Sequence, residues 1–135
     1  MFQSDFSYMI SPAMFARFVV PELRESCRRV DHGFYHLDGI GQLPHLDGLL
    51  QIEPLRGVQW VPGAGRKEPC QWPEVFNKIL AAGKRIQTWA CPQEELDVIE
   101  YTGGARGIIF QVRELAEEEA ETFFACVRRA SRAAR

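Results

Sequence analysis

The sequence predicts an α/β protein in which four parallel β-strands alternate with helices, after an N-terminal helix. Three observations support this fold class. Short apolar segments alternate with segments whose apolar residues recur every three or four positions, the patterns of buried strands and amphipathic helices. Glycines and prolines separate these segments. Strands that alternate with helices pair in parallel through right-handed crossovers, and no linker-like stretch interrupts residues 1–135, so we expect a single domain.

The first helix is expected to begin at Ser11 and Pro12. A serine N-cap accepts a hydrogen bond from a free backbone amide, and proline at the first helical position has no amide to satisfy. Apolar residues then recur at three- and four-residue steps as far as Cys27, which is typical of an amphipathic helix. Pro21 lies inside this pattern, so we expect the helix to kink or divide near Val20.

Four pairs of strand and helix follow. Apolar segments predict strands at residues 33–37, 58–61, 84–90 and 108–112. Helical spacing predicts helices at about 44–52, 72–82, 92–101 and 114–132. Gly83 suits the left-handed residue that ends the second of these helices. In the last helix, acidic residues come early and basic residues late, which complements the helix dipole.

The composition excludes several classes of protein. Of the 135 residues, 46% are hydrophobic and 25% are charged, which is the range of a soluble globular domain. Sixteen basic and eighteen acidic residues give a net charge of −2, so no overall positive field attracts nucleic acid. The sequence has no signal-peptide pattern and no membrane-spanning apolar stretch. We therefore expect a cytoplasmic protein with reduced cysteines, and neither nucleic acid nor membrane as a partner.

Ligand-binding residues are expected after the strands, because ligands bind beyond the carboxyl ends of a parallel sheet. The candidates follow the first two strands: His36, Asp38, Gln59, Trp60, Gly63 and Gly65. Gly63 and Gly65 either cradle an anion with backbone amides or are required by the turn itself.

His36 and Asp38 also form a candidate metal site. Residues two apart in a strand share a face, and zinc accepts imidazole nitrogen and carboxylate oxygen. Cys91, two strands away, is the thiol nearest to this pair in the predicted fold. In the alternative interpretation, Asp38 accepts hydrogen bonds from loop amides, and His36 is a satisfied polar residue or binds an organic carboxylate.

Four segments carry a family resemblance: ISPAMFARFVVPEL at 10–23, FYHLDGIGQLPHLDGLLQI at 34–52, GVQWVPGAG at 57–65 and AAGKRIQ at 81–87. Together they resemble the C-terminal part of the uroporphyrinogen decarboxylase superfamily. These proteins are (β/α)8 barrels that include the decarboxylase and the zinc-dependent, corrinoid-linked methyltransferases. The resemblance covers nearly all of the chain, but a full barrel of this kind needs about 250 residues. It therefore implies a partial TIM barrel, or half-barrel.

The resemblance also implies a function. It points to decarboxylase or methyltransferase chemistry on a tetrapyrrole, a corrinoid or another small organic anion. The family's catalytic Asp and substrate-binding Arg residues belong to barrel units that this chain lacks. Where the methyltransferases bind zinc through a His-x-Cys motif, this sequence has His36-Leu37-Asp38. A flat tetrapyrrole or corrinoid could lie against Trp60 and Trp89, although aromatic residues at alternate strand positions also belong to protein cores.

Four strands of a barrel leave two sheet edges that the missing half would pair. We therefore expect either a homodimer or a complex with a separately encoded N-terminal half-barrel, unless the first helix covers an edge. The alternative to an enzyme is a noncatalytic half-barrel that binds a small ligand or serves as an assembly partner.

Overall fold

The computed structural model describes residues 1–90, 92–112 and 115–133. Its centre is one sheet of four strands: β1 (Phe34–Asp38), β2 (Gly57–Val61), β3 (Arg85–Ala90) and β4 (Ile108–Val112). All three neighbouring pairs are parallel, and the strands lie in chain order, β1-β2-β3-β4. The predicted α/β fold with four parallel strands is confirmed.

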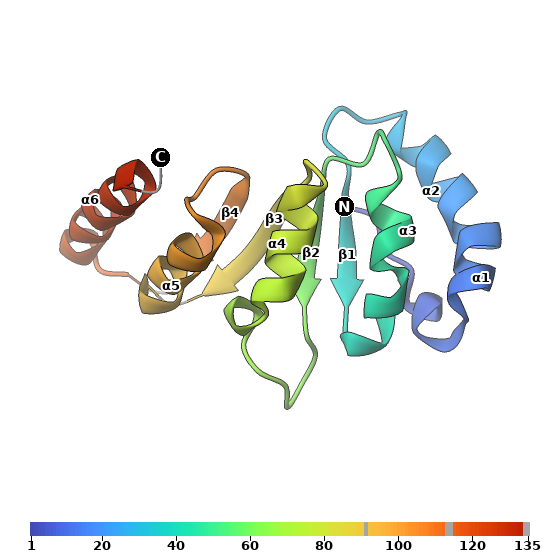
Figure 1. The fold of residues 1–135 in the computed structure, drawn as a ribbon, viewed down its shortest axis with the longest axis horizontal. Helices are drawn as coiled ribbons and strands as arrows, with labels where there is room; N and C mark the ends of the chain where they lie inside the picture. Colours follow the sequence, from blue (N-terminus) through green and yellow to red (C-terminus); the bar gives the residue numbers. More distant parts are fainter. Residues whose placement is uncertain (91, 113–114, 134–135) are drawn as a thin grey trace.

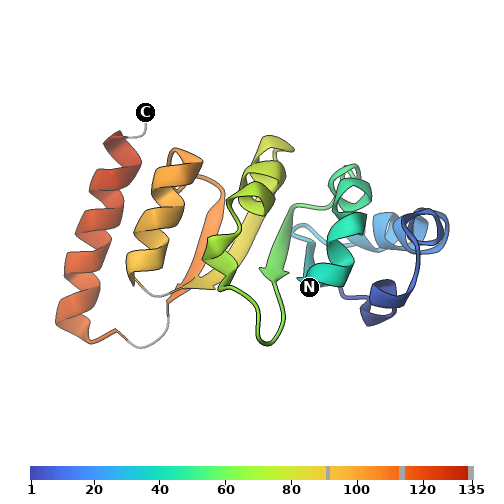
Figure 2. The same cartoon turned by 60° about the horizontal axis from the view of Figure 1, so that its bottom comes forward.

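The helices after the strands lie side by side on one face of the sheet (Figures 1 and 2). They are α3 (Leu46–Leu50), α4 (Pro73–Ala81), α5 (Pro92–Thr102) and α6 (Glu117–Ala133). Two short 3-10 helices, η3 (Ile40–His45) and η4 (Pro69–Gln71), lead into α3 and α4. Right-handed crossovers that always step to the next strand place every helix on the same face. No described helix covers the opposite face. Because the strands are parallel, their carboxyl ends all lie at the same end of the sheet (Figure 1).

The predicted irregularity in the first helix is a π-helical turn. The helix is divided into α1 (Pro12–Met14), the π-helical segment η2 (Phe15–Val19) and α2 (Val20–Cys27). The Ser11 hydroxyl accepts a hydrogen bond of 3.2 Å from the Met14 amide, as an N-cap. The Val20 amide donates to the Phe15 carbonyl five residues earlier. Pro21 has no amide and its ring collides with the carbonyl of the preceding turn in a regular helix, which accounts for the wider turn.

The N-terminal segment has structure that the sequence analysis did not predict. The Phe2 backbone forms a parallel bridge to Tyr35 at the outer edge of β1. The Phe2 amide donates to the Phe34 carbonyl at 2.7 Å, and the His36 amide donates to the Phe2 carbonyl at 2.8 Å. The 3-10 helix η1 (Asp5–Met9) follows. The N-terminal segment therefore covers part of one edge of the sheet.

The core lies between the sheet and its helices. Its largest fully buried side chains include Trp60, Tyr35, Phe15, Phe76 and Leu37. Buried polar groups attach the N-terminal segment to this core. His45 Nε2 donates to the Ser7 carbonyl at 2.7 Å, and the His45 ring stacks on Phe15 with 4.4 Å between ring centres. Among the described residues, none of the helices combines the length and apolarity that crossing a bilayer requires.

Lys84 links the start of β3 to the segment that follows α3. Its Nζ atom donates to the carbonyl oxygens of Ile52 at 2.8 Å, Glu53 at 3.2 Å and Leu55 at 2.7 Å. These carbonyls lie in the segment that follows α3, and that of Ile52 also accepts from the Leu55 amide at 3.1 Å. Lys84, the residue immediately before β3, therefore stabilises the connection between α3 and β2.

Candidate strand-end site

The structure brings three of the predicted residues together on the helix-free face. Tyr35 and Leu37 of β1 are buried, so His36 and Asp38 point to the other side of the strand. Gln59 is the register partner of His36 on β2, and its Oε1 atom accepts a hydrogen bond from His36 Nδ1. An amide oxygen only accepts, so this bond places a proton on Nδ1.

The other ring nitrogen of His36 faces Asp38. Nε2 lies 3.7 Å from Asp38 Oδ2, and the two side chains are 19% and 45% exposed. In the neutral ring, Nε2 carries a lone pair that can accept a proton or bind a metal. In the protonated ring, Nε2 forms an ion pair with the carboxylate. This arrangement can receive a proton from a ligand or hold a cation.

Zinc fits this pair only in part. A tetrahedral zinc ion with ligands at about 2.0–2.2 Å separates two of them by about 3.4 Å, close to the observed spacing. Catalytic zinc sites use three protein ligands. No group of three suitable side chains occurs within residues 1–90, 92–112 and 115–133. The third predicted ligand, Cys91, lies outside the described residues.

A hollow of ≈ 370 Å³ adjoins Asp38, between the strand ends and the loop after β2. This volume is within the range of small-molecule sites. Asp38, Gly63, Gly65 and Trp89 line it, together with the basic side chains of Arg66 and Lys67 in the same loop. Glu68 lines it as well, so its walls combine two carboxylates, two cations and an indole. We call this hollow, together with His36 and Gln59, the strand-end site.

The two glycines of the loop are required by its turns. Gly63 and Gly65 have φ of +96° and +71°, at which the backbone of any residue with a Cβ atom is strained. A Cβ atom on Gly65 would meet no atom within 4 Å, so backbone conformation selects glycine there. The predicted turn requirement is thereby met, and both glycines also line the hollow.

Trp60 is placed apart from the other predicted residues. Its side chain is 0% exposed and belongs to the core on the helix side of the sheet. Its ring packs edge-on against Trp72, with 5.5 Å between ring centres. The reason is strand alternation, because Gln59 points to the open face and the next residue must point to the helices. Trp89 is the tryptophan that lines the hollow.

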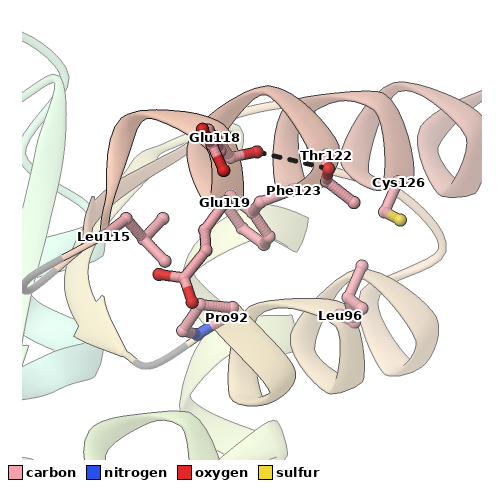
Figure 3. A pocket seen from close by; sticks show the side chains of 8 residues that line it. All are labelled: Pro92, Leu96, Leu115, Glu118, Glu119, Thr122, Phe123 and Cys126. Atoms are coloured by element: carbon pink, nitrogen blue, oxygen red, sulfur yellow. Dashed lines mark hydrogen bonds between the residues drawn. The ribbon is translucent and has the colours of Figure 1, made fainter.

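A second hollow, of ≈ 440 Å³, lies between α5 and α6 (Figure 3). Leu96 and Phe123 supply apolar walls, and Glu118 and Glu119 lie at its rim. Glu119 Oε2 accepts from the Ala116 amide at 3.1 Å, which caps the start of α6. Among the residues that the structure describes, the lining includes no basic side chain and no histidine. These residues therefore do not supply the cations and the imidazole that make the strand-end site a candidate for chemistry.

Several residues in or beside the site were not among the predicted binding residues. Arg66 and Lys67 form an adjacent basic pair in the loop after the second strand, and this pair is visible in the sequence. Tyr8 lies over the turn after β1, in contact with the glycines that follow Asp38. The two glycines at positions 39 and 41 were the only local sign that another group approaches this turn.

Comparisons of the chain with protein-family models, with curated proteins and with solved structures found no match. Evidence for a function therefore comes from the residues and their arrangement. The candidate residues gather at the carboxyl ends of β1, β2 and β3.

Proposed function

We propose that the chain forms the carboxy-terminal half of a (β/α)8 barrel of the uroporphyrinogen decarboxylase type, and that the strand-end site binds a tetrapyrrole carboxylate. The parallel strands in chain order and the helices on one face support the barrel. The sequence resemblance over residues 10–87 supports the family. The observation that carries the ligand assignment is that Asp38, the partner of His36, lines a hollow in which the cations Arg66 and Lys67 and the indole of Trp89 also lie, together with the Glu68 carboxylate.

Each group has a role that follows from its chemistry. Arg66 and Lys67 attract and hydrogen-bond ligand carboxylates. Trp89 offers a flat apolar surface to the ring system. Gln59 fixes the His36 ring so that Nε2 stays toward Asp38. Loss of CO2 from a carboxylate side chain leaves an electron pair on carbon, and a protonated His36 held this way can donate the proton that completes the reaction.

Porphyrin binding tests this proposal. Uroporphyrin, which carries carboxylates on a planar macrocycle, is titrated into the purified chain while tryptophan fluorescence is followed. We expect saturable binding that weakens about tenfold in the Arg66→Ala/Lys67→Ala variant, because each cation contributes a charge-assisted hydrogen bond. The matched control is Arg128→Ala/Arg129→Ala, which removes two exposed cations from α6. Absence of saturable binding, or equal affinity of both variants, overturns the proposal.

The spacing of His36 Nε2 and Asp38 Oδ2 favours a second candidate, zinc-dependent methyl transfer involving a corrinoid. Zinc at this position would stabilise a substrate thiolate, the form of sulfur that accepts a methyl group. His36 and Asp38 would be two of its ligands, and Cys91 is the third predicted one. Metal analysis separates the candidates: about one zinc per chain, lost in His36→Ala, supports methyl transfer. If neither protein contains zinc, zinc-dependent methyl transfer is excluded.

The proposal includes a partner for the half-barrel. The residues described for β4 place it at an edge of the sheet, and Ile109 on this strand is an exposed apolar residue. A second copy or a separate N-terminal half-barrel would pair with this edge. Sedimentation of the purified chain tests self-association, and a well-folded monomer at micromolar concentration contradicts a homodimer. A noncatalytic binding module is favoured if no partner that carries Asp and Arg restores turnover.

A further inference from the structure

Tyr8 lies flat against the turn that follows β1. An added Cβ atom on Gly41 would lie 2.5 Å from Cε2 of Tyr8, and one on Gly39 would lie 3.0 Å from the same atom. Gly39 also needs glycine for its φ of +84°, whereas Gly41 does not have a positive φ. The absence of a side chain at position 41 therefore serves mainly to admit the tyrosine ring.

The turn beneath Tyr8 lies next to the strand-end site. The Gly39 amide donates to the Val61 carbonyl at 2.7 Å, which holds the turn against the end of β2. A Cβ atom on Gly63 would lie 3.7 Å from Cα of Gly39, so the two loops touch. Gly63 and Asp38 line the hollow, and Asp38 immediately precedes the turn. Tyr8 therefore lies beside the site, on the side of Asp38, and is separated from the residues that line the hollow by the turn itself.

Tyr8 is well placed to contact a ligand. Although its ring packs on the turn, the residue remains 53% exposed. Its hydroxyl forms no hydrogen bond with any residue that the structure describes. Phe6 and Met9 of the same short helix are also exposed, and this helix, dark blue in Figure 1, lies at the end of the sheet toward which the strand arrows point. The ring thus presents an apolar face beside charged groups.

We propose that Tyr8 is a specificity-determining residue of the strand-end site. Its ring packs against the planar part of the ligand, while Arg66 and Lys67 in the loop after β2 bind the carboxylates. This inference rests on the proposed function and adds a requirement for a flat ring system. Aromatic faces favour stacked or edge contacts with other rings. Acyclic polycarboxylates meet the charge requirement of the site but give Tyr8 nothing to pack against.

Binding of two ligands to three variants tests the role of the ring. The ligands are uroporphyrin and citrate, which carries carboxylates without a ring. We expect Tyr8→Ala to weaken uroporphyrin binding about tenfold, which is about 1.4 kcal/mol, and to leave citrate binding unchanged, because only the ring system loses a stacking partner. Tyr8→Phe retains wild-type affinity because the ring remains. Phe124→Ala, which removes an equally exposed ring from α6 (53% exposed), serves as the control.

Gly41→Ala tests the geometry without altering residue 8. The added methyl group occupies the place of the Tyr8 ring and displaces it. We expect this variant to weaken uroporphyrin binding about as much as Tyr8→Ala, and the double variant to lose no more than either single one, since both remove the same contact. Circular dichroism confirms that each variant is folded. Additive losses in the double variant would show that Gly41 acts independently of Tyr8, and would overturn the inference.

The outcomes separate this inference from the proposed function. If the wild-type chain binds neither ligand, the proposed function fails. If it binds uroporphyrin and the Arg66→Ala/Lys67→Ala variant weakens binding but Tyr8→Ala does not, the proposed function stands and the role of Tyr8 is excluded. Equal losses for both ligands in Tyr8→Ala would indicate a general disturbance of the turn, which also contradicts specificity for flat ligands.

Discussion

His36 and Gln59 form a hydrogen-bonded pair across neighbouring strands, with Nδ1 of the ring donating to Oε1 of the amide. This bond selects one neutral form of the imidazole, because the proton must lie on Nδ1. His45 has the opposite arrangement, since its Nε2 atom donates to the Ser7 carbonyl. Two of the three histidines of the chain thus have opposite tautomers assigned by their partners.

Nitrogen NMR checks this assignment. At a pH where the rings are neutral, we expect His36 to be protonated on Nδ1 and His45 on Nε2. Gln59→Leu removes the acceptor, so His36 should shift toward the Nε2 form that free imidazole side chains favour. His45 should not change in this variant and serves as its internal control. Finding His36 on Nε2 in the wild-type protein would show that the Gln59 amide has the reverse orientation.

Glu95 makes the stability of the protein depend on pH. It is 1% exposed in the first turns of α5, and burial raises its pKa from 4.5 to about 7. The folded state therefore binds the proton more tightly than the unfolded state, so the free energy of unfolding falls as the pH rises from about 4.5 to about 7. In Glu95→Gln this decline should be smaller, by on the order of 3 kcal/mol.

Urea unfolding at pH 4.5, 6 and 8 measures this difference. The control is Glu100→Gln, which alters an exposed carboxylate on the same helix. Parallel pH profiles for wild type and Glu95→Gln would contradict a raised pKa in the folded state. A greater stability of wild type at pH 8 than at pH 4.5, relative to Glu95→Gln, would reverse the sign.

Lys84 should contribute more to stability than the exposed ion pair between α3 and α4. Lys84→Met leaves the carbonyls of Ile52, Glu53 and Leu55 without their shared donor, which we expect to cost about 2–3 kcal/mol. The matched variant is Lys78→Met, which breaks a 2.7 Å ion pair with Asp47. Both side chains of that pair are largely exposed, so its loss should cost less than about 1 kcal/mol. Equal losses in urea unfolding would contradict the structural role of Lys84.

Thiol labelling should distinguish the cysteines. Cys27 and Cys70 are buried, and burial, with a smaller effect of Glu94, raises the pKa of Cys70 to about 12. A thiol in this state forms little thiolate near pH 8 and reacts slowly. In a Cys91→Ser variant, we expect Cys126 to react first with a disulfide reagent and the other two only at the rate of unfolding. Fast labelling of Cys70 in the folded protein would contradict this order.

The sequence was sufficient for the four strands because their signals are local. Val58 and Ile86 belong to short apolar segments between turn residues, and the observed strands begin and end within one residue of the predicted ones. Phe2 and η1 were not predicted because tertiary contacts determine them. The Phe2 bridge depends on β1, more than thirty residues later in the chain, and η1 is held by His45 through the Ser7 carbonyl.

The candidate site could be predicted only in outline. The pairing of His36 with Asp38 follows from their spacing of two in one strand, and the structure places them on one face. The position of Trp60 required the register between β1 and β2, which aligns Gln59 with His36 and turns Trp60 to the helices. Register depends on packing between strands and leaves no mark in a single segment. The contact of Tyr8 with Gly41 is likewise invisible until the two turns are placed.

The bridge at Phe2 makes the two borders of the sheet unequal. Along Phe34–His36, the outward backbone groups already have partners in the same polypeptide, so a foreign strand that approaches there must first displace them. Among the described residues, no strand or bridge pairs with the outer edge of β4. Misassembly by strand addition is therefore expected to be directional, starting from β4, and a proline or lysine introduced on that strand should suppress it more than the same change near the amino terminus.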